Sequence, residues 1–229
     1  MTVLADQRTW PAEILTPAEA AALIGACSAN SRTGIRNRAL LKLLTKSGLR
    51  ISEAIGYPGR EEMQFTDRDG NLKVQKERPV IEPLKKDDIN FTRHDIRILH
   101  TKSRKPQTRG FHPSIDDSLH RWIDVRRDLG LNGRQPLFCT LQGKPLSAQY
   151  VRALLGRLKE KAGIERRVYP HGLRHTFACE LLFRDVDVVT ISKLMGHESI
   201  ATTERYLDHL TNSKAIAKLV EIDWPDLED

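Results

Sequence analysis

Apolar residues recur at helical spacing in the first quarter of the chain. Thr16-Pro17-Ala18-Glu19 is a capping box with proline at the first helical position, so a helix is expected to run to about Cys27. A second helix is expected from about Ile35 to Lys46, with four leucines on its apolar face. Ser47-Gly48 interrupts this pattern, and one or two further helical turns are expected over residues 50–55.

Residues 57–82 lack this periodicity and have few apolar positions. Pro58-Gly59 and Asp69-Gly70-Asn71 are turn signals, so the stretch is expected to be a long loop or insertion with a hairpin at the second turn. Lys73, Lys76 and Arg78 allow contact with a nucleic acid. Alternatively, the stretch contacts a partner subunit, or it is a loop that contacts nothing.

The remaining pattern predicts one small sheet and several helices. Polar and apolar residues alternate over residues 95–100, and a second extended piece near residues 109–112 would complete an antiparallel hairpin. Helices are expected from a Ser114 cap to Leu129, over residues 147–161, and over most of the chain from Gly172 onward. Breaks are expected at residues 185–187, 196–197 and 211–212. The predicted fold is therefore mainly α with a small antiparallel β-sheet, an α+β class.

These elements divide the chain into a leader over residues 1–15, one domain over residues 16–212 and a tail over residues 213–229. The tail begins with a short amphipathic segment, residues 213–222, and ends in an acidic stretch. Its predicted helix either packs on its own domain or docks on a neighbouring subunit, and the sequence leaves both open.

Charge adds a candidate partner to this picture. The formal net charge is +7, with basic clusters over residues 93–109 and 151–175 and five acids over residues 221–229. This distribution suits a phosphate-binding cleft, although solvated helix faces have the same composition. No apolar run is long enough to span a membrane and no export signal is visible, so a cytoplasmic protein is expected. Cys27, Cys139 and Cys179 are isolated and are expected to be buried core residues.

Four short segments carry the candidate chemistry. They are Ser47-Gly48-Leu49-Arg50-Ile51-Ser52-Glu53, the basic turn Thr101-Lys102-Ser103-Arg104-Lys105, the box His171-Gly172-Leu173-Arg174-His175, and Gly196-His197 followed by Tyr206. Alone, each has an ordinary explanation such as a surface arginine or a half-buried tyrosine. His171 and His175 have the spacing of two metal ligands, but neither an HExxH pattern nor a third ligand accompanies them, so no metal or other cofactor is expected.

Together, in this order and at this spacing, the four segments resemble the tyrosine recombinases of the phage integrase family over roughly residues 15–212. The resemblance implies the catalytic-domain fold of that family and site-specific cleavage and rejoining of DNA, in events such as DNA integration and the movement of mobile elements. It implies a catalytic set at six matching positions: Arg50, Lys102, His171, Arg174, His197 and Tyr206. Glu53 and His175 match supporting positions, and the DNA-binding candidates are Arg104, Lys105, Arg109, Arg152, Arg166 and Arg167.

The residue types agree with those roles. Two guanidinium groups, permanently charged and able to bind bidentately, suit the extra charge on a phosphodiester under attack. Tyr206 is then the nucleophile, His171 the leading candidate to accept its proton, Lys102 the acid that protonates the departing 5′ oxygen, and His197 a hydrogen-bond donor to the phosphate. The resulting 3′-phosphotyrosyl bond conserves the energy of the cut linkage, so rejoining needs no ATP.

The chain also departs from the family pattern. Members of the family commonly carry a helical core-binding domain before the catalytic domain, whereas only about fifteen residues precede the first expected helix here. The expected partners are duplex DNA, further copies of the chain in a dimer or tetramer on DNA, and an accessory DNA-binding protein. Two alternatives stay open: a type IB topoisomerase-like enzyme that nicks and reseals DNA, and a DNA-binding regulator with the recombinase fold and little turnover. The short spacing from His197 to Tyr206 favours a recombinase over the topoisomerase.

Overall fold

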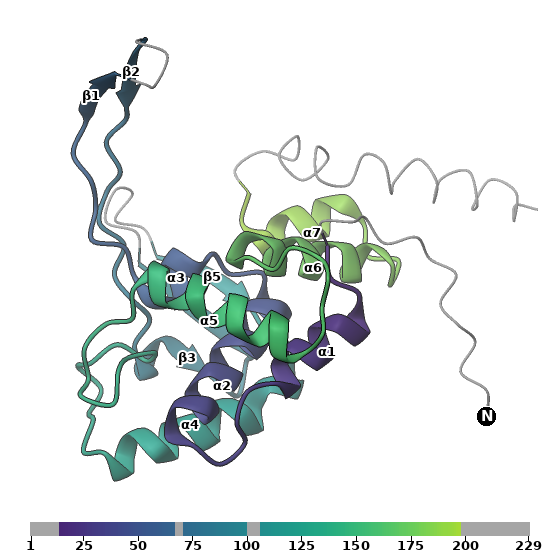
Figure 1. Ribbon diagram of the computed structural model, residues 1–229. Coiled ribbons are helices and arrows are strands. Elements are labelled where there is room, and N and C mark those ends of the chain that lie inside the picture. The colour runs from purple at the N-terminus through teal and green to yellow at the C-terminus, as the bar shows by residue number, and fades with distance from the viewer. Residues whose placement is uncertain (1–13, 67–70, 100–105, 198–229) are drawn as a thin grey trace, which may run out of the picture.

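The computed structural model describes residues 14–66, 71–99 and 106–197, so Lys102, Arg104, Lys105, Tyr206 and the tail lie outside the described residues. About half of the described chain is helical, and the strands are few and short, in agreement with the predicted mainly helical fold with a small antiparallel sheet (Figure 1). The helices are α1 (Pro17–Gly25), α2 (Arg32–Ser47), α3 (Ile51–Ile55), α4 (Asp116–Asp128), α5 (Ala148–Lys161), α6 (Pro170–Leu182) and α7 (Val188–Met195), with the 3₁₀ turns η1 (Lys86–Asp88) and η2 (Pro113–Ile115).

The first two helices begin at side-chain caps. Thr16 Oγ1 accepts a hydrogen bond from the Glu19 amide at 3.1 Å, and Glu19 Oε2 accepts one from the Thr16 amide at 2.8 Å, which confirms the expected capping box. Ser31 caps α2, so this helix begins three residues earlier than predicted. Its leucines are fully buried against α4 and α6, which makes α2 the central helix of the domain.

Three short strands form the sheet beside these helices. The strands β3 (Ile89–Asn90), β4 (Asp95–Ile98) and β5 (Gln107–Gly110) pair antiparallel in the order β3-β4-β5. The expected hairpin is present, but β5 begins two residues before the predicted extended piece. β3 was not predicted, because a two-residue strand is too short to show alternation.

A second, two-stranded sheet confirms the expected hairpin within residues 57–82. β1 (Met63–Thr66) pairs antiparallel with β2 (Leu72–Gln75), and the isolated bridges Tyr57↔Ile81 and Arg60↔Arg78 continue the pairing toward the body of the domain. We call residues 57–81 the arm. Figure 1 shows the arm projecting away from the helices.

The start of α4 differs from the prediction. Ser114 does not cap it, because residues 113–115 form the 3₁₀ turn η2, in which the Ser114 amide donates to Nδ1 of His112. α4 begins at Asp116 without a side-chain cap and ends before Gly130, which has the expected left-handed conformation (φ +69°).

The apolar side chains form two clusters. The larger lies among α1, α2, α4, α5 and the three-stranded sheet, and the smaller lies between α6 and α7 with Ile14. Cys27, Cys139 and Cys179 are buried with free thiols, as expected. Within the described ranges, no helix combines the length and apolarity needed to cross a membrane.

Candidate active site

The turn between α2 and α3 places the first arginine of the site. Gly48 adopts a left-handed conformation (φ +62°), and a β-carbon there would come within 2.5 Å of the Phe177 ring, so both backbone and packing require glycine. The turn redirects the chain so that Arg50 becomes the N-cap residue of α3. The Arg50 side chain is 42% exposed and reaches the surface of the domain.

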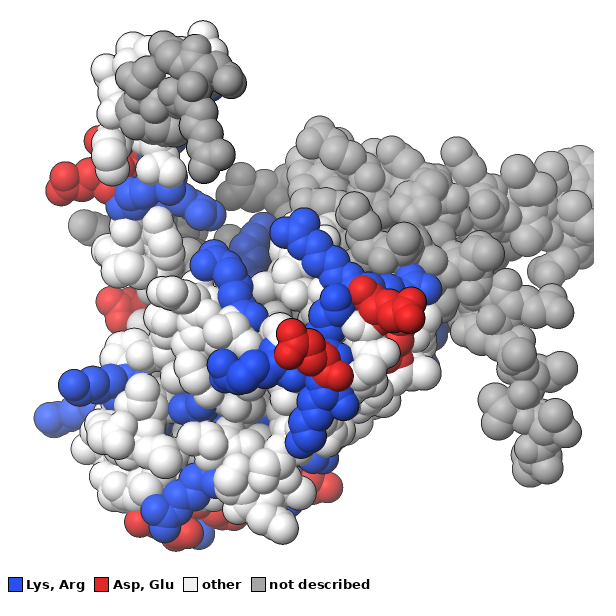
Figure 2. Space-filling view, viewed as in Figure 1, with Lys and Arg blue, Asp and Glu red and all other residues white. Residues whose placement is uncertain are grey.

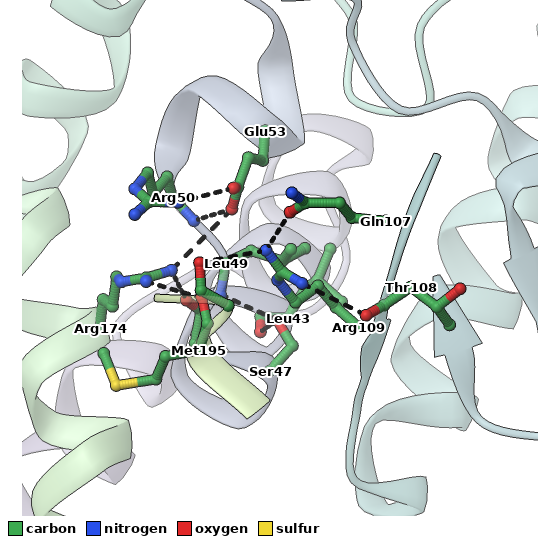
Figure 3. A network of polar contacts seen from close by, with 12 residues as sticks. Leu43, Ser47, Leu49, Arg50, Glu53, Gln107, Thr108, Arg109, Arg174 and Met195 are labelled. Atoms are coloured by element: carbon green, nitrogen blue, oxygen red, sulfur yellow. Dashed lines mark hydrogen bonds and ion pairs between the residues drawn. The ribbon is translucent and has the colours of Figure 1, made fainter. Parts of the chain in front are cut away.

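Glu53 is the buried carboxylate that joins this turn to the rest of the site. Its Oε2 accepts the Arg50 amide at 2.7 Å, and its Oε1 accepts Nη1 of Arg50 at 3.0 Å. Its Oε2 also lies 3.9 Å from Nη1 of Arg174, which comes from α6 (Figure 3). One fully buried carboxylate therefore orients two guanidinium groups that are 124 positions apart in the sequence.

Arg174 is almost fully buried, at 1% exposure. Its Nη1 donates to the Gly48 carbonyl, and its Nη2 donates to the Met195 carbonyl at 2.7 Å. The guanidinium thus connects the turn before α3 with the C-terminal end of α7 (Figure 3). These fixed acceptors and Glu53 hold its position before any substrate arrives.

Two histidines from the same helix stand beside Arg174. The rings of His171 and His175, one turn apart on α6, lie edge to face with centroids 4.4 Å apart. Burial and the positive charges of Arg174 and Arg50 hold the pKa of His171 below its ordinary value. Burial, His171 and Arg174 lower the pKa of His175 to about 4. Both imidazoles are therefore neutral at pH 7, and neutral His171 can accept a proton.

His197 follows α7 directly. Gly196 ends the helix in a left-handed conformation (φ +63°), and the His197 amide donates to the Ser192 carbonyl at 3.0 Å. Burial lowers the pKa of His197 to about 4, and Arg174 and Arg50 contribute to the same effect. The end of α7 thereby places a neutral imidazole within the field of both arginines.

The candidate DNA contacts are scattered over different environments. Arg152 on α5 and Arg167 are exposed, and the Arg167 guanidinium lies 5.1 Å from the centre of the Tyr169 ring. Figure 2 shows Lys and Arg side chains over the face formed by α5, with carboxylates among them. Arg166 instead pairs with Glu19 at 3.1 Å and donates to the Ile14 carbonyl, so it ties its loop to α1.

Arg109, a DNA-binding candidate in the sequence, is not on the surface. It is 6% exposed, and its guanidinium lies in the network of Figure 3, where Glu53 and Arg50 are its charged neighbours. The signal for this was available in the strand alternation, because Arg109 precedes buried Phe111 by two residues and so shares its face. The many basic residues around the hairpin instead favoured a DNA contact for Arg109.

The structure thus brings together six of the expected catalytic and supporting residues and places Arg109 beside them. The six are Arg50, Glu53, His171, Arg174, His175 and His197, with His175 packed against His171. Two oriented guanidinium groups and neutral imidazoles are suited to binding a phosphodiester and moving protons around it. Among the described residues, no group of three or more His, Cys, Asp or Glu side chains is arranged to hold a metal ion.

Comparison with known proteins places the chain in a family. The sequence pattern of the phage integrase family matches residues 80–213. Tyrosine recombinase XerD of Xanthomonas campestris pv. campestris is 32% identical over 213 residues, which are 90% of this chain and 58% of the relative. Tyrosine recombinase XerC of Corynebacterium glutamicum is 28% identical over 83% of this chain and 52% of the relative.

Solved structures show the same fold. The crystal structure of XerA recombinase superposes with a TM-score of 0.65 at 25% identity, covering 84% of this chain and 59% of that one. The catalytic domain of bacteriophage HP1 integrase superposes with a TM-score of 0.51 at 21% identity, covering 85% of this chain and 86% of that one. The fold is that of tyrosine recombinase catalytic domains. The chain belongs to the phage integrase family, and it spans little more than half the length of these Xer relatives.

Proposed function

We propose that this chain is a site-specific recombinase that cleaves and rejoins duplex DNA through a covalent bond between Tyr206 and a 3′ phosphate. The observation that carries the proposal is the placement of Arg50 and Arg174 around buried Glu53, beside His171 and His197. Family membership supports the same reading, because the matched region of the family pattern includes Tyr206.

The two guanidinium groups bind the scissile phosphate. Attack on phosphorus adds charge to its non-bridging oxygens, and preorganised cations stabilise that charge more than they stabilise the ground state. Arg50, which is 42% exposed, is open to the DNA backbone, whereas Arg174 is held from behind by the Met195 and Gly48 carbonyls. His197 donates a hydrogen bond to the same phosphate.

Proton transfers accompany the cleavage. The Tyr206 oxygen forms a bond to phosphorus as its proton passes to neutral His171, and the bond from phosphorus to the 5′ oxygen breaks as Lys102 donates a proton to that oxygen. The products are a 3′-phosphotyrosyl linkage and a free 5′ hydroxyl. Rejoining is the reverse reaction with another 5′ hydroxyl, so each cycle restores the enzyme.

Duplex DNA is the proposed substrate, and structurally similar proteins that were solved with DNA support this proposal. The XerH recombinase was solved on a palindromic difH substrate, and the Tn1549 transposon integrase was solved with circular intermediate DNA. We also propose that two or four copies of this chain assemble on DNA with an accessory DNA-binding protein and act in the cytoplasm. The exposed Arg152 and Arg167 are proposed to contact phosphates, which makes the affinity fall steeply with salt.

Covalent trapping tests the proposal. Nicked duplexes tiled across the DNA that flanks the gene are incubated with wild-type protein, Tyr206→Phe and the matched control Tyr57→Phe, whose tyrosine lies in the arm. Denaturing gels then report protein-linked strands, with and without a chelator. We expect a 3′-linked adduct with wild type and Tyr57→Phe, unchanged by the chelator, and no adduct with Tyr206→Phe.

Each other outcome has a defined meaning. An adduct that persists in Tyr206→Phe would overturn the assignment of the nucleophile. Binding without any adduct on any tile would favour the DNA-binding regulator. An adduct accompanied by relaxation of a supercoiled plasmid that lacks a second site, without exchange between two sites, would favour the topoisomerase-like enzyme.

A further inference from the structure

Arg109 enters the candidate site from the sheet. It lies on β5 opposite Ile96 of β4, and its side chain points to the interior, where it is 6% exposed. An arginine is rarely this buried without a carboxylate partner. Within the described part of the chain, however, its guanidinium donates hydrogen bonds only to neutral oxygens, and its Nε is buried without a hydrogen-bond acceptor.

The acceptors of Arg109 show what the side chain holds. Nη2 donates to Oε1 of Gln107 at 2.5 Å and lies 3.5 Å from the Gly196 carbonyl oxygen, and Nη1 donates to the Thr108 carbonyl at 3.3 Å. A β-carbon built on Gly196 would overlap the guanidinium itself. The flat face of Arg109 is therefore packed directly on the α-carbon of Gly196, and Gln107 fixes it from the strand side.

Two guanidinium groups from different elements thus hold consecutive carbonyls at the end of α7. Arg174 of α6 binds the Met195 carbonyl at 2.7 Å, and Arg109 of β5 contacts the Gly196 carbonyl. Cations at a helix C-terminus are favoured by the helix dipole and by the free carbonyls there. The next residue is His197. No residue lies between it and Gly196, so a shift of the C-terminal end of α7 would also shift His197.

We propose that Arg109 is a positioning residue, which clamps the C-terminal end of α7 to the sheet and thereby fixes the location of His197 in the site. The proposal rests on the proposed function, in which His197 binds the scissile phosphate. In the sequence, the strand that carries Arg109 follows Lys102, and the helix end that it contacts precedes Tyr206. A 1 Å displacement of a catalytic group is enough to slow a reaction about 100-fold.

The charge of Arg109 gives this role a measurable signature. Charged and titratable groups face His197 from three elements: Arg50 at the start of α3, His171, Arg174 and His175 on α6, and Arg109 on β5. Each positive charge disfavours the imidazolium form and so lowers the pKa of His197. Removing the Arg109 charge must then move the pKa of His197 upward.

The experiment compares Arg109→Met and Arg109→Lys with wild type and with Arg97→Met. Arg97 is the matched control, because it lies on the neighbouring strand β4 with its side chain 58% exposed. Three quantities are measured: the pKa of His197 by NMR titration of the free protein, the exchange rate of the His197 amide, and the single-turnover rate of adduct formation on a nicked duplex. DNA affinity is measured alongside.

We expect Arg109→Met to raise the pKa of His197, to speed exchange of its amide, and to slow adduct formation by about 10–100-fold while DNA affinity changes less than about twofold. Arg109→Lys keeps the charge but loses the flat contact on Gly196. Its His197 pKa should stay near the wild-type value while amide exchange is faster. Arg97→Met should match wild type in all three quantities.

An unchanged His197 pKa and amide exchange in Arg109→Met would overturn the proposal. Weaker DNA binding with unchanged His197 behaviour would show Arg109 to be a DNA contact instead. If Arg109→Met does not fold, the amide exchange in Arg109→Lys decides, and wild-type exchange there rejects the clamp. Because the titration and the exchange need no DNA, they judge the clamp even if wild-type protein forms no adduct and the proposed function fails.

Discussion

Oε2 of Glu53 lies 3.9 Å from Nη1 of Arg174, and the exposed fractions of the two side chains are 0% and 1%. The same carboxylate accepts the amide and Nη1 of Arg50, so one buried anion interacts with both guanidinium groups. A buried carboxylate of this kind is expensive to desolvate, and its attraction to buried cations offsets that cost only when the groups are held in a good geometry. Glu53 therefore orients the two arginines that bind the scissile phosphate in the proposed reaction.

Glu53→Gln tests this arrangement. Glutamine keeps the volume and can still accept the Arg50 amide, but it removes the negative charge 3.9 Å from the buried Arg174 guanidinium. We expect the free energy of unfolding to fall by about 3–5 kcal/mol, measured by urea denaturation. The matched control is Glu180→Gln, whose partners Lys46 and Arg184 are 35% and 67% exposed, so its loss should stay within about 1 kcal/mol. Equal losses in the two variants would contradict the role given to Glu53.

The histidines of the site predict an acid-sensitive fold. The pKa values of His175 and His197 are both about 4, below the ordinary value near 6.5 that the unfolded chain restores. Between these pH values the unfolded state binds more protons than the folded state, so the free energy of unfolding decreases as the pH falls from about 6.5 to about 4. Above pH 7 both states are neutral at these positions, and no such dependence arises from them.

His175→Asn measures that contribution directly. The variant should lose part of the decrease in unfolding free energy between pH 6.5 and 4, because one imidazole no longer takes up a proton on unfolding. Above pH 7 its curve should run parallel to the wild-type curve, which serves as the internal control. A variant that keeps the full wild-type acid slope would show that the His175 imidazole is not held neutral by the fold.

Gly196→Ala separates backbone conformation from side-chain packing at the end of α7. Gly130 is the matched control, since it has a similar left-handed φ of +69° but no atom within 4 Å of an added β-carbon. Gly130→Ala should lower the free energy of unfolding by about 1–2 kcal/mol through conformation alone. Gly196→Ala should lower it further, because the new methyl group displaces the Arg109 guanidinium.

A double-mutant cycle assigns that additional loss. In an Arg109→Ala background the guanidinium is absent, so Gly196→Ala should become as mild as Gly130→Ala, with a coupling of about 0.5–3 kcal/mol between the two positions. The measurement is urea denaturation of the four proteins. Additive effects of the two substitutions would mean that Arg109 and Gly196 are not packed against each other as the structure shows.

The sequence was a good guide wherever the signal was local. The capping box at Thr16, the left-handed glycine after Leu129 and the helix break at Gly196 each depend on a few adjacent residues, and all are present in the structure. Of the four motif segments, the described residues of three meet around Glu53: Arg50, the box at residues 171–175, and His197. The segment over residues 101–105 and Tyr206 lie outside the described residues. The assembly of the three segments is non-local, however, and it was predictable only through the resemblance to a known family.

Arg109 shows what local patterns miss. Its neighbours in sequence are basic and polar, which favoured a surface contact, while its structural neighbours Gly196 and Glu53 come from distant elements. Ser114 failed as a helix cap for a related reason, since the preceding His112 caps the 3₁₀ turn η2 first. For Arg109 the decisive contacts come from residues distant in the sequence. For Ser114 the His112 side chain forms the cap of the preceding 3₁₀ turn, and α4 starts only after that turn.

The arm contributes no described residue to either apolar cluster, so it should be separable from the core. Met63, Leu72 and Val74 are 54%, 68% and 51% exposed, so the arm buries little apolar surface against the body. Arg60 and Arg78 exchange backbone hydrogen bonds of 2.8 and 2.7 Å, which is the geometry that a two-residue turn can close. Replacing residues 61–77 with Asn-Gly should therefore leave the free energy of unfolding within about 1 kcal/mol of wild type.

Removal of the whole arm, residues 57–81, is the control for that result. Gly56 packs against the Ile81 carbonyl and Pro83, where an added β-carbon would meet atoms at 3.0–3.1 Å, so replacing residues 57–81 removes contacts with the body and should destabilise the domain measurably. The shorter variant then separates the alternatives for the arm. Weaker DNA binding by the isolated chain would make the arm a DNA contact, whereas unchanged binding with impaired assembly on two sites would make it a subunit contact. A large loss of stability on removing residues 61–77 would contradict the independence of the arm from the core, because side chains that are half exposed cannot supply it.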